Sequence, residues 1–583
     1  MIKYVSTRGG ASGTFTDTIL EGLASDGGLL VPEKYEVISE ERLAQWQNLP
    51  YPELACEVIS CFATDLTKDK IREICHEVYT STNFGDDIVS VKPINLAPKE
   101  ELYILGISNG PTLAFKDMAM QFLGKLFDEI LNVRGIKLNI LGATSGDTGS
   151  AAEYAMMGRR SVSVFMLSPK DRMSEFQKSQ MYSIKEQNIH NIVVPGSFDN
   201  CQDLVKAVSN DLRFKGSYSI GSVNSINWGR ITAQVVYYFF GYFKVIKRSK
   251  KNLMHPVSFA VPSGNFGNIL SGFVAKKMGL PIKNLVLATN ENNVLDEFFK
   301  SGVYRVRNPK ETFVTSSPSM DISKASNFER FIYEIFDRDS KYVSTLWTEL
   351  GKNNSFSIDA QSLAKLKKES GIVSGSSRHV NRIDTIQRVY ESNQLVVDPH
   401  TADGIYVGER FVEDNIPMIC LETALPTKFE GTVREALGFV PERRDSLKNI
   451  EDKERKVYEM NGSLSDLKNY IIKNAKINLS IKGNINDQKI RPLLFISYIE
   501  NAFKHGVDLE GKTDISIDID IKEEELEFNC TNLIGAKPLE KEGKGVGMKN
   551  TLDQLKILYP DRHNLQTFEK NNNFTVNLKL KLD

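Results

Sequence analysis

The sequence lacks several features that would place it in a specialised class of protein. It has six cysteines in 583 residues, with no CxxC pair and no histidine at ligand spacing, which argues against a zinc site and against a disulfide framework. Neither charge dominates, because 73 lysines and arginines face 74 aspartates and glutamates. Bulk electrostatics therefore gives no case for a nucleic-acid or anionic-membrane partner.

Long apolar runs and targeting signals are also missing. No segment reaches the roughly 18 apolar residues that a membrane helix needs. The first ten residues, MIKYVSTRGG, lack the basic and apolar regions of a signal peptide. The densest apolar stretch, residues 235–243, is followed at once by Lys244, so we predict a buried core helix there. We expect a cytoplasmic protein without a membrane partner.

What is present is an ordinary globular composition, with 25% charged and 41% hydrophobic residues. At about 100–200 residues per domain, the length predicts about three to five domains. Residues 1–90 have a helical pattern and are predicted to form a small first domain. The charged stretch from residue 446 to 488 is predicted to be a linker. Beyond it, the strands ISIDIDIKEEELEFNC and FTVNLKLKL alternate polar with apolar residues, as in an antiparallel sheet.

Between these parts, residues 91–445 alternate short apolar runs with amphipathic stretches, which predicts an α/β domain in two lobes. The apolar runs at 138–141, 161–167, 191–194 and 257–261 are each followed by a loop and a helix. This series predicts mostly parallel sheets with helices on both faces. Ligands of such sheets bind beyond the carboxyl ends of the strands, where these loops fall.

Two of the loops and one lysine suggest chemistry. The loop SGNFGN (263–268) follows a strand and opens a helix, so its N–H groups and the helix dipole form an anion cradle. The loop ATSGDTG (143–149) has the same position and suits a carboxylate. Lys116 lies among apolar residues in GPTLAFKDMAMQFLG, where desolvation would lower the pKa of its amine. Together these are the parts of a pyridoxal-phosphate (PLP) site.

The chain from residue 1 to about 440 resembles the threonine synthase family, which consists of PLP enzymes of fold type II. The resemblance is carried by PTLAFKD (111–117), GATSGDTGSAA (142–152), MLSPKDRMSEFQKSQM (166–181), GSFDNCQDLVK (196–206), SINWGRITAQ (225–234), PSGNFGN (262–268) and ETALPTKF (422–429). It departs from the family at Asn109, where histidine is common, and at Leu425, where the family often reads TAHPAKF. We expect these departures to affect positioning and turnover and to leave the reaction type unchanged.

The resemblance also implies roles for individual residues. Lys116 would form the internal aldimine with PLP and act as general base, and Thr423 would face the pyridine nitrogen. The cofactor phosphate would be held by Gly264, Asn265, Phe266, Gly267 and Asn268. The substrate carboxylate would be received by Ser145, Gly146 and Thr148. The phosphate of the substrate would be bound by Asn227 and Arg230.

The implied reaction converts O-phospho-L-homoserine and water to L-threonine and phosphate. Two other hypotheses stay open at this point. One is a PLP-dependent dehydratase of serine or threonine, and the other is a nucleotide-binding signalling protein with a non-catalytic front half. The sequence leaves the oligomeric state open.

Residues 489–583 resemble a different family, the ATP-binding (GHKL) domain of LytS-type sensor histidine kinases, which is an α/β sandwich. KIRPLLFISYIENAFKHG (489–506) and GKGVGMKNTLDQLKILYP (543–560) carry this resemblance. It implies that Asn501 holds Mg²⁺ and that Mg-ATP contacts Asn501, His505, Gly545 and Gly547. No histidine lies between residues 401 and 504, so the phosphoacceptor helix is missing, and 446–488 holds only part of the kinase pattern. The tail is thus expected to be an incomplete fused module, a nucleotide sensor, or inert.

Overall fold

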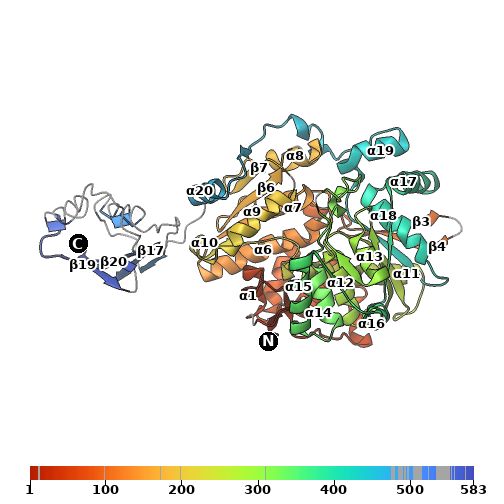
Figure 1. Ribbon diagram of the computed structural model, residues 1–583, viewed down its shortest axis with the longest axis horizontal. Coiled ribbons are helices and arrows are strands. Elements are labelled where there is room, and N and C mark those ends of the chain that lie inside the picture. The colour runs from red at the N-terminus through yellow and green to blue at the C-terminus, as the bar shows by residue number, and fades with distance from the viewer. Residues whose placement is uncertain are drawn as a thin grey trace. The chain divides into compact units, whose positions relative to one another are not determined.

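The computed structural model describes residues 1–583 apart from 11–12, 97–98, 171–172, 197, 309, 475–479, 484–489, 491–493, 496–497, 500, 503–514, 523, 534–551, 553–554, 557, 571–572 and 583. The chain divides into two compact units (Figure 1). The first unit consists of Met1–Gly135, Ile140–Val205 and Gly221–Leu467. The second consists of Ile136–Asn139, Lys206–Ile220 and Lys468–Asp583.

The first unit contains a six-stranded sheet in the order β13-β10-β9-β14-β4-β3. Its strands are β13 (Ile372–Ser376), β10 (Ile282–Thr289), β9 (Val257–Pro262), β14 (Met418–Glu422), β4 (Lys99–Gly106) and β3 (Ser90–Leu96). All neighbours pair in parallel except β3, which is antiparallel to β4. The predicted mostly parallel sheet is therefore confirmed.

Helices cover both faces of this sheet. A β-carbon on Gly272 of α12 (Gly267–Lys277) would lie 2.9 Å from Leu285 of β10. Helix α18 (Pro399–Gly408) instead shares a core with Ala260 and Val286. Because consecutive strand residues point to opposite faces, Leu285 and Val286 mark two different sides of the sheet. Helix α11 (Trp228–Arg248) buries every residue from 228 to 243, which confirms the predicted core helix.

The second lobe is built on a five-stranded sheet in the order β15-β7-β6-β5-β8, most of whose residues belong to the first unit. Its strands are β15 (Tyr458–Glu459), β7 (Ile189–Val194), β6 (Val162–Pro169), β5 (Leu138–Ala143) and β8 (Ile220–Gly221). The helices that follow β5, β6 and β7 are α7 (Asp147–Met156), α8 (Glu175–Tyr182) and α9 (Phe198–Asn210). The capping box predicted from Ser174 and Gln177 is present at the start of α8.

Strand β15 lies within the segment for which the sequence predicts a linker. Tyr458 and Glu459 do not form part of a linker but pair in parallel with Ile192 and Val193 of β7. Ion pairs hold the charged residues before it, because Arg455 contacts Glu175 at 2.9 Å. The first unit therefore extends past the predicted limit at residue 445, and the charges that suggested a solvated linker instead pair with the second lobe.

The remaining elements lie around these sheets. Up to β3 they are β1 (Tyr4–Ser6), α1 (Phe15–Glu21), β2 (Leu30–Pro32), α2 (Glu40–Trp46), α3 (Tyr51–Ser60), α4 (Lys68–Val78) and α5 (Ser81–Phe84). After β4 they are α6 (Lys116–Arg134), α10 (Leu212–Ser217), α13 (Val294–Ser301), β11 (Val303–Arg305), η1 (Pro318–Met320), α14 (Phe328–Ile335), α15 (Ser340–Asn353), β12 (Ser355–Ser357), α16 (Ala360–Ser370), α17 (His379–Asn393), η2 (Glu409–Phe411), η3 (Pro426–Phe429), α19 (Glu430–Leu437), η4 (Asp445–Leu447), η5 (Ile450–Asp452) and α20 (Leu464–Asn474).

The C-terminal part of the second unit contains a sheet in the order β16-β17-β18-β20-β19. Its strands are β16 (Ser480–Gly483), β17 (Ile515–Lys522), β18 (Glu525–Leu533), β19 (His563–Lys570) and β20 (Asn573–Lys581). Strands β17, β18, β20 and β19 pair in antiparallel fashion, as the alternating sequences of β17, β18 and β20 predict. One face is apolar and packs against Phe495, Tyr498 and Leu555.

Two absences concern only the described part of the chain. No helix there is long and apolar enough to cross a membrane. No group of three or more histidine, cysteine, aspartate or glutamate side chains there is arranged to hold a metal ion.

Candidate active site

Lys116 is the first residue of α6 and follows the loop after β4. This loop runs beside the residues that follow β14. The Phe115 N–H donates to the Thr423 carbonyl at 2.9 Å, and the Leu425 N–H donates to the Leu113 carbonyl at 3.0 Å. Since β4 and β14 are parallel neighbours, their carboxyl ends meet at one edge of the sheet. The pairing thus brings Lys116 and Thr423 together.

The backbone of this loop is strained and held in place. Leu113 has φ of 60°, in the left-handed region that residues other than glycine rarely adopt. The Asp117 carboxylate accepts hydrogen bonds from the Thr112 N–H and the Thr112 hydroxyl, both at 2.7 Å. Burial raises the pKa of Asp117 to about 6, although the bonds from Thr112 act in the opposite direction. Such strain persists only where surrounding contacts fix it, as they do here.

Lys116 belongs to a buried cluster of charges. Its Nζ lies 3.3 Å from Asp147 Oδ2, and Lys428 Nζ lies 2.8 Å from Asp147 Oδ1. The exposed fractions of these side chains are 12% for Lys116, 3% for Asp147 and 0% for Lys428. Burial lowers the pKa of Lys116, although Asp147 raises it. Burial alone would raise the pKa of Asp147, but the two ammonium groups hold it well below its usual range. The carboxylate is therefore ionised, and the Lys116 amine is easier to deprotonate than an exposed lysine.

Ser319 joins this cluster to the second glycine loop. Its hydroxyl donates to Asp147 Oδ2 at 2.6 Å. Its N–H donates to His400 Nε2 at 3.1 Å, and His400 Nδ1 lies 2.8 Å from Asp398 Oδ1. A β-carbon on Gly264 would lie 3.0 Å from the Ser319 carbonyl oxygen. Ser319 therefore lies between Asp147 and the predicted phosphate loop.

The loop Gly264–Asn268 follows β9 and opens α12. Any side chain at Gly264 would also lie 2.9 Å from Ile322, so the close packing requires glycine. Phe266 caps α12 with φ of 64° and packs on Phe328 and Phe331. The other two members of the loop contact the segment after residue 326: the Asn265 carbonyl accepts from the Asn327 N–H at 3.1 Å, and Gly267 faces the Asn327 side chain.

Asn268 completes this loop with an unpaired donor. Its Oδ1 accepts from the hydroxyls of Tyr237 at 2.6 Å and Tyr238 at 3.0 Å. Its Nδ2 is buried and has no hydrogen-bond partner among the described residues. A buried N–H group without an acceptor is costly, and here it stands at the N-terminus of a helix. The loop is therefore suited to a phosphate.

The first glycine loop surrounds Asp147. The Thr144 hydroxyl oxygen accepts from the N–H groups of Gly146 at 2.9 Å and Gly149 at 2.8 Å. Gly146 has φ of 130° and caps α7, whose first N–H groups have no intrahelical partner. Ser145 is exposed and Thr148 is half-buried. The three predicted carboxylate-binding residues thus flank the charge cluster at a helix N-terminus.

Arg230 and Asn227 lie at the start of α11 and differ in their bonding. The Arg230 guanidinium is 3% exposed. It donates through one nitrogen to the Val223 carbonyl at 3.2 Å, and its Nε has no partner within the described part of the chain. Burial lowers the pKa of Arg230 to about 10. Asn227, in contrast, caps α11 and donates to the carbonyls of Ile19 and Ser222. A phosphate on Asn227 would compete with these bonds, and its predicted ligand contact stays a prediction.

Comparisons with known proteins identify the family. A family profile described as "Threonine synthase N terminus" matches residues 3–79, and one described as "Threonine synthase, C-terminal" matches residues 401–471. The threonine synthase of Methylobacillus glycogenes is 49% identical over 477 residues, which cover 81% of this chain and 99% of that protein. The chain belongs to the threonine synthase family of PLP-dependent lyases.

Further relatives support this membership of the threonine synthase family. The threonine synthase of Corynebacterium glutamicum is 46% identical and is matched over 100% of its length. The crystal structure of PLP-bound threonine synthase from Brucella melitensis has a TM-score of 0.75 and 37% sequence identity. The alignment of the two structures covers 82% of this chain and 100% of the Brucella melitensis chain. The relatives are thus matched over their full lengths, while this chain has further residues.

Asn109, the departure from the threonine synthase pattern, has its own partners. Its Nδ2 donates to the Asp87 carbonyl at 3.1 Å. Arg444 donates to the Asn109 carbonyl at 3.0 Å and to Oδ1 at 3.3 Å. Leu425, the other departure, packs with Leu113 in a small apolar cluster. Both departures therefore brace the loop that carries Lys116.

Sequence reasoning missed three residues of the charge cluster at Lys116: Asp147, Ser319 and Lys428. Asp147 lies within the predicted carboxylate loop, but an acidic residue in the first turn of a helix is common and carries no functional signal by itself. Ser319 and Lys428 approach Asp147 from 172 and 281 residues away in sequence. Only the fold brings these three side chains together.

The predicted ATP site falls mostly outside the described residues. His505, Gly545 and Gly547 belong to stretches that the structure does not describe. Asn501 is half-buried and adjoins Ala502, which is part of the apolar core of the C-terminal sheet. The prediction that this chain carries a nucleotide-binding tail stays a prediction.

Proposed function

We propose that the protein converts O-phospho-L-homoserine and water to L-threonine and inorganic phosphate, with PLP as cofactor. The observation that carries this proposal is the guanidinium of Arg230, which is buried, incompletely hydrogen-bonded and without an acidic partner in the described residues. Its positive charge helps to lower the pKa of Lys116, so we infer that the two groups belong to one site. An uncompensated buried cation calls for an anionic ligand, and a planar guanidinium suits a phosphate.

The residues present fit PLP. Gly264 leaves room where a side chain would collide, and the Asn268 Nδ2 needs an acceptor, so this loop would hold the cofactor phosphate. The Lys116 amine would hold the aldehyde carbon, and the buried Thr423 hydroxyl would face the pyridine nitrogen. When bound, PLP supplies an electron-withdrawing ring that acidifies the C–H bonds near the substrate's amino group.

The chain's own residues would then move protons and hold charges. Lys116, whose pKa is lowered by burial, accepts a proton from Cα of the substrate and then one from Cβ. Phosphate leaves from Cγ with the electrons of the C–O bond, while Arg230 holds its negative charge. Protons return to Cγ and Cα, and water adds its hydroxyl at Cβ. Asp147 holds the Lys116 side chain in place through a direct ion pair, and Lys428 in turn pairs with the other oxygen of Asp147.

Substrate orientation would depend on the first glycine loop. The N-terminus of α7 presents N–H groups near Ser145, Gly146 and Thr148, which would bind the α-carboxylate. With the carboxylate at α7 and the phosphate at Arg230, both ends of the substrate are fixed and the reacting carbons lie beside Lys116.

The test is a measurement of product formation with the purified protein. We expect stoichiometric release of phosphate and formation of threonine from O-phospho-L-homoserine. Ammonia release from serine or threonine, without phosphate release from O-phospho-L-homoserine, would instead establish the dehydratase hypothesis. Arg230 makes the first outcome the expected one, because serine and threonine have no second anion besides the α-carboxylate, which we assign to α7, to pair with this cation.

For residues 489–583 we propose, separately, a nucleotide-binding fold that uses Asn501 to hold the magnesium of Mg-ATP. Support comes from the two kinase-like sequence stretches, 489–506 and 543–560, and from the antiparallel sheet, whose apolar core includes Ala502 next to Asn501. Calorimetric titration with Mg-ATP tests this proposal. Binding that disappears in Asn501→Ala would support it, and no heat of binding in the parent chain would refute it.

A further inference from the structure

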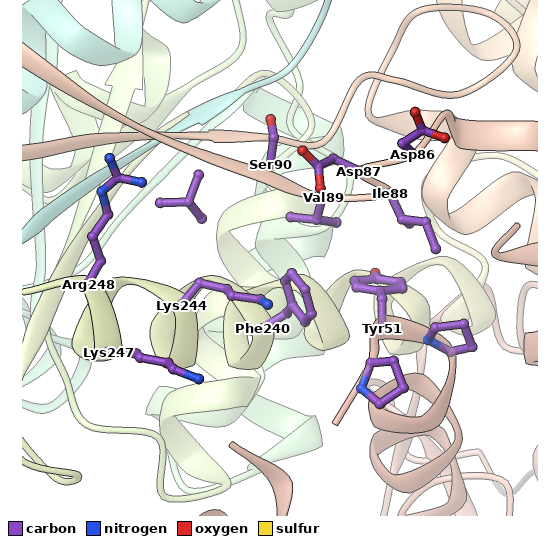
Figure 2. A pocket seen from close by; sticks show the side chains of 13 residues that line it. Tyr51, Asp86, Asp87, Ile88, Val89, Ser90, Phe240, Lys244, Lys247 and Arg248 are labelled. Carbon is purple, nitrogen blue, oxygen red and sulfur yellow. The ribbon is translucent and has the colours of Figure 1, made fainter. Parts of the chain in front are cut away.

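A second cavity lies outside the Lys116 site, between the C-terminal half of α11 and the segment that leads into β3 (Figure 2). Its volume is about 530 Å³. Small-molecule sites typically enclose about 300 to 1,000 Å³. All of its lining residues belong to the first unit. The cavity is therefore large enough for a metabolite, and it lies entirely within the first unit.

The two walls of the cavity carry opposite charges. Helix α11 contributes Lys244, Lys247 and Arg248, and the facing segment contributes Asp86 and Asp87 (Figure 2). Lys247 donates to Asn48 at 3.3 Å. Lys244 and Arg248 form no ion pair within the described residues, and neither do the two aspartates. Both walls therefore keep charge available for a ligand.

The floor of the cavity is mostly apolar. Tyr51 is 3% exposed and Phe240 is 7% exposed, and their rings meet edge to face at 5.2 Å. Ile88 and Val89 close the floor on the side of the aspartates. Lys244 Nζ lies 4.9 Å above the Phe240 ring, so its charge lies at the border of the apolar region. Charges of both signs around an apolar floor match a zwitterion with an apolar side chain.

We propose that this cavity is an effector site for an α-amino acid with a large apolar side chain. The carboxylate of the amino acid would face Lys244 and Arg248, and its ammonium group would face Asp86 and Asp87. The side chain would lie on Tyr51 and Phe240. A simple anion would leave the aspartates unpaired, and a simple amine would leave the cations unpaired, so the zwitterion is the favoured ligand.

Two contact routes connect this site to Lys116. In the first, Tyr51 packs on Tyr79 at 4.9 Å, and the Tyr79 hydroxyl donates to the Met118 carbonyl at 2.9 Å, in the first turn of α6. In the second, the Asp87 carbonyl accepts from Asn109 at 3.1 Å, in the loop before Lys116. Ligand binding that shifts Tyr51 or Asp87 would therefore alter the position of Lys116.

Helix α11 provides a third link. It runs from Arg230 near its start to Arg248 at its end, about 27 Å at 1.5 Å per residue. The same helix thus presents the proposed substrate-phosphate ligand at one end and the effector cations at the other. The regulatory effect of the amino acid rests on the proposed function, whereas its binding does not.

The experiment is calorimetry on holoenzyme that has been reduced with borohydride, so that amino acids cannot react with the cofactor at Lys116. L-Phenylalanine is the probe, and phenethylamine and 3-phenylpropanoate are its single-charge analogues. We expect L-phenylalanine to bind at micromolar to millimolar concentration and each analogue to bind at least about tenfold more weakly. Equal binding of either analogue, or no binding of L-phenylalanine, would overturn the proposal.

Variants separate this cavity from the rest of the protein. Lys244→Ala/Arg248→Ala and Asp86→Asn/Asp87→Asn should each weaken L-phenylalanine binding about tenfold or more, while the exposed Lys34→Ala should bind like the parent. Unchanged affinity in both double variants would place the ligand elsewhere and refute the site. In the unreduced enzyme, L-phenylalanine should change the rate of phosphate release in the parent and not in the double variants. If the protein releases no phosphate at all, the proposed function fails while the binding result still stands.

Discussion

The first unit buries charged side chains, whereas the core of the C-terminal sheet is almost entirely apolar. The first unit buries Asp147, Lys428 and Arg230 within or beside one site. In the described part of residues 468–583, the buried side chains are apolar except for Asn532. The core of this region consists of packed apolar side chains, such as those of Phe528 and Leu578 from the strands.

This contrast separates fold from chemistry. Burying a charge costs free energy unless it is paired, and even a paired charge is seldom more stabilising than a well-packed apolar side chain. The cluster around Lys116 is therefore difficult to explain by stability alone, whereas the apolar core of the C-terminal sheet needs no other explanation. A fold without such a cluster says little about activity.

The largest effect is expected at Lys116. Lys116→Ala removes the amine that would hold the cofactor and move the protons, so kcat for phosphate release should fall at least about 10³-fold. Lys125→Ala, on the same helix but in surface ion pairs with Glu77 and Glu129, should keep parental activity. Retention of more than a few per cent of activity in Lys116→Ala would remove this lysine from the mechanism.

Arg230→Met should lower kcat/KM for O-phospho-L-homoserine about 10²-fold, chiefly by raising KM, because a buried phosphate contact is lost. The matched control is Arg330, which is also fully buried but donates to three acceptors, the Leu30 and Ile226 carbonyls and Asn327 Oδ1. Arg330→Met should mainly lower Tm. If both variants only lose stability, Arg230 is structural and the phosphate site lies elsewhere.

Asp147→Asn should have a smaller effect, which depends on pH. Asp147 raises the pKa of Lys116, so its neutralisation should lower that pKa further and let the amine react at lower pH. The pH midpoint for PLP incorporation into cofactor-free protein should therefore move down, and kcat should fall about tenfold because the ion pairs are lost. The control is Asp128→Asn, which removes an ion pair with Arg159 outside the site. An unchanged pH midpoint would contradict the assignment of Asp147.

Glu153→Gln tests whether a buried carboxyl group lowers the stability of the first unit. Glu153 of α7 is buried, its Oε1 has no hydrogen-bond partner among the residues that the structure describes, and burial raises its pKa well above the usual range. The folded protein then holds a proton that the unfolded chain releases near its ordinary pKa, so stability falls as pH rises above that value. Glu153→Gln should be nearly neutral at acidic pH and stabilising at pH 8. The measurement is Tm against pH, with exposed Glu391→Gln as control; parallel profiles for the parent and Glu153→Gln would contradict the expectation.

The smallest effect is expected from removing the C-terminal sheet. A chain that ends at residue 471, where the family profile ends, retains β15 and every residue proposed to take part in threonine formation. Its kcat/KM should differ from that of the full chain by less than about twofold, since no residue proposed to bind PLP or O-phospho-L-homoserine lies beyond that point. A large loss of activity, restored by adding the missing segment in trans, would show that the two regions depend on each other.

Much of the fold and part of the site could be predicted from local pattern. Strand, loop and helix repeats predict the parallel sheets, and period-two alternation predicts β17, β18 and β20, because both signals lie within a few residues. Lys116 and the loop at Gly264 stand in motifs and were predicted. Strand β15 was not predicted from the sequence. It is only two residues long and lies among charged residues, so its sequence has no pattern typical of a strand.

Other residues could not be assigned from sequence for a different physical reason. Asn227 stands next to Arg230 in one motif, yet helix capping engages its amide, and spacing alone does not distinguish a cap from a ligand. Lys428 and Ser319 contact Asp147 only after β14 and the segment around η1 have packed. Long-range contacts of this kind are determined by the tertiary fold.

The strand order of the six-stranded sheet has a consequence for biosynthesis. Strand β14, from residues 418–422, lies between β9 and β4, which are made more than 150 residues earlier. The sheet therefore stays split while the ribosome is still translating the first 400 codons, and its two halves join only when the late strand emerges. Nascent chains cannot complete the lysine-bearing loop before then, and chaperones that shield open sheet edges would have their longest engagement during this interval.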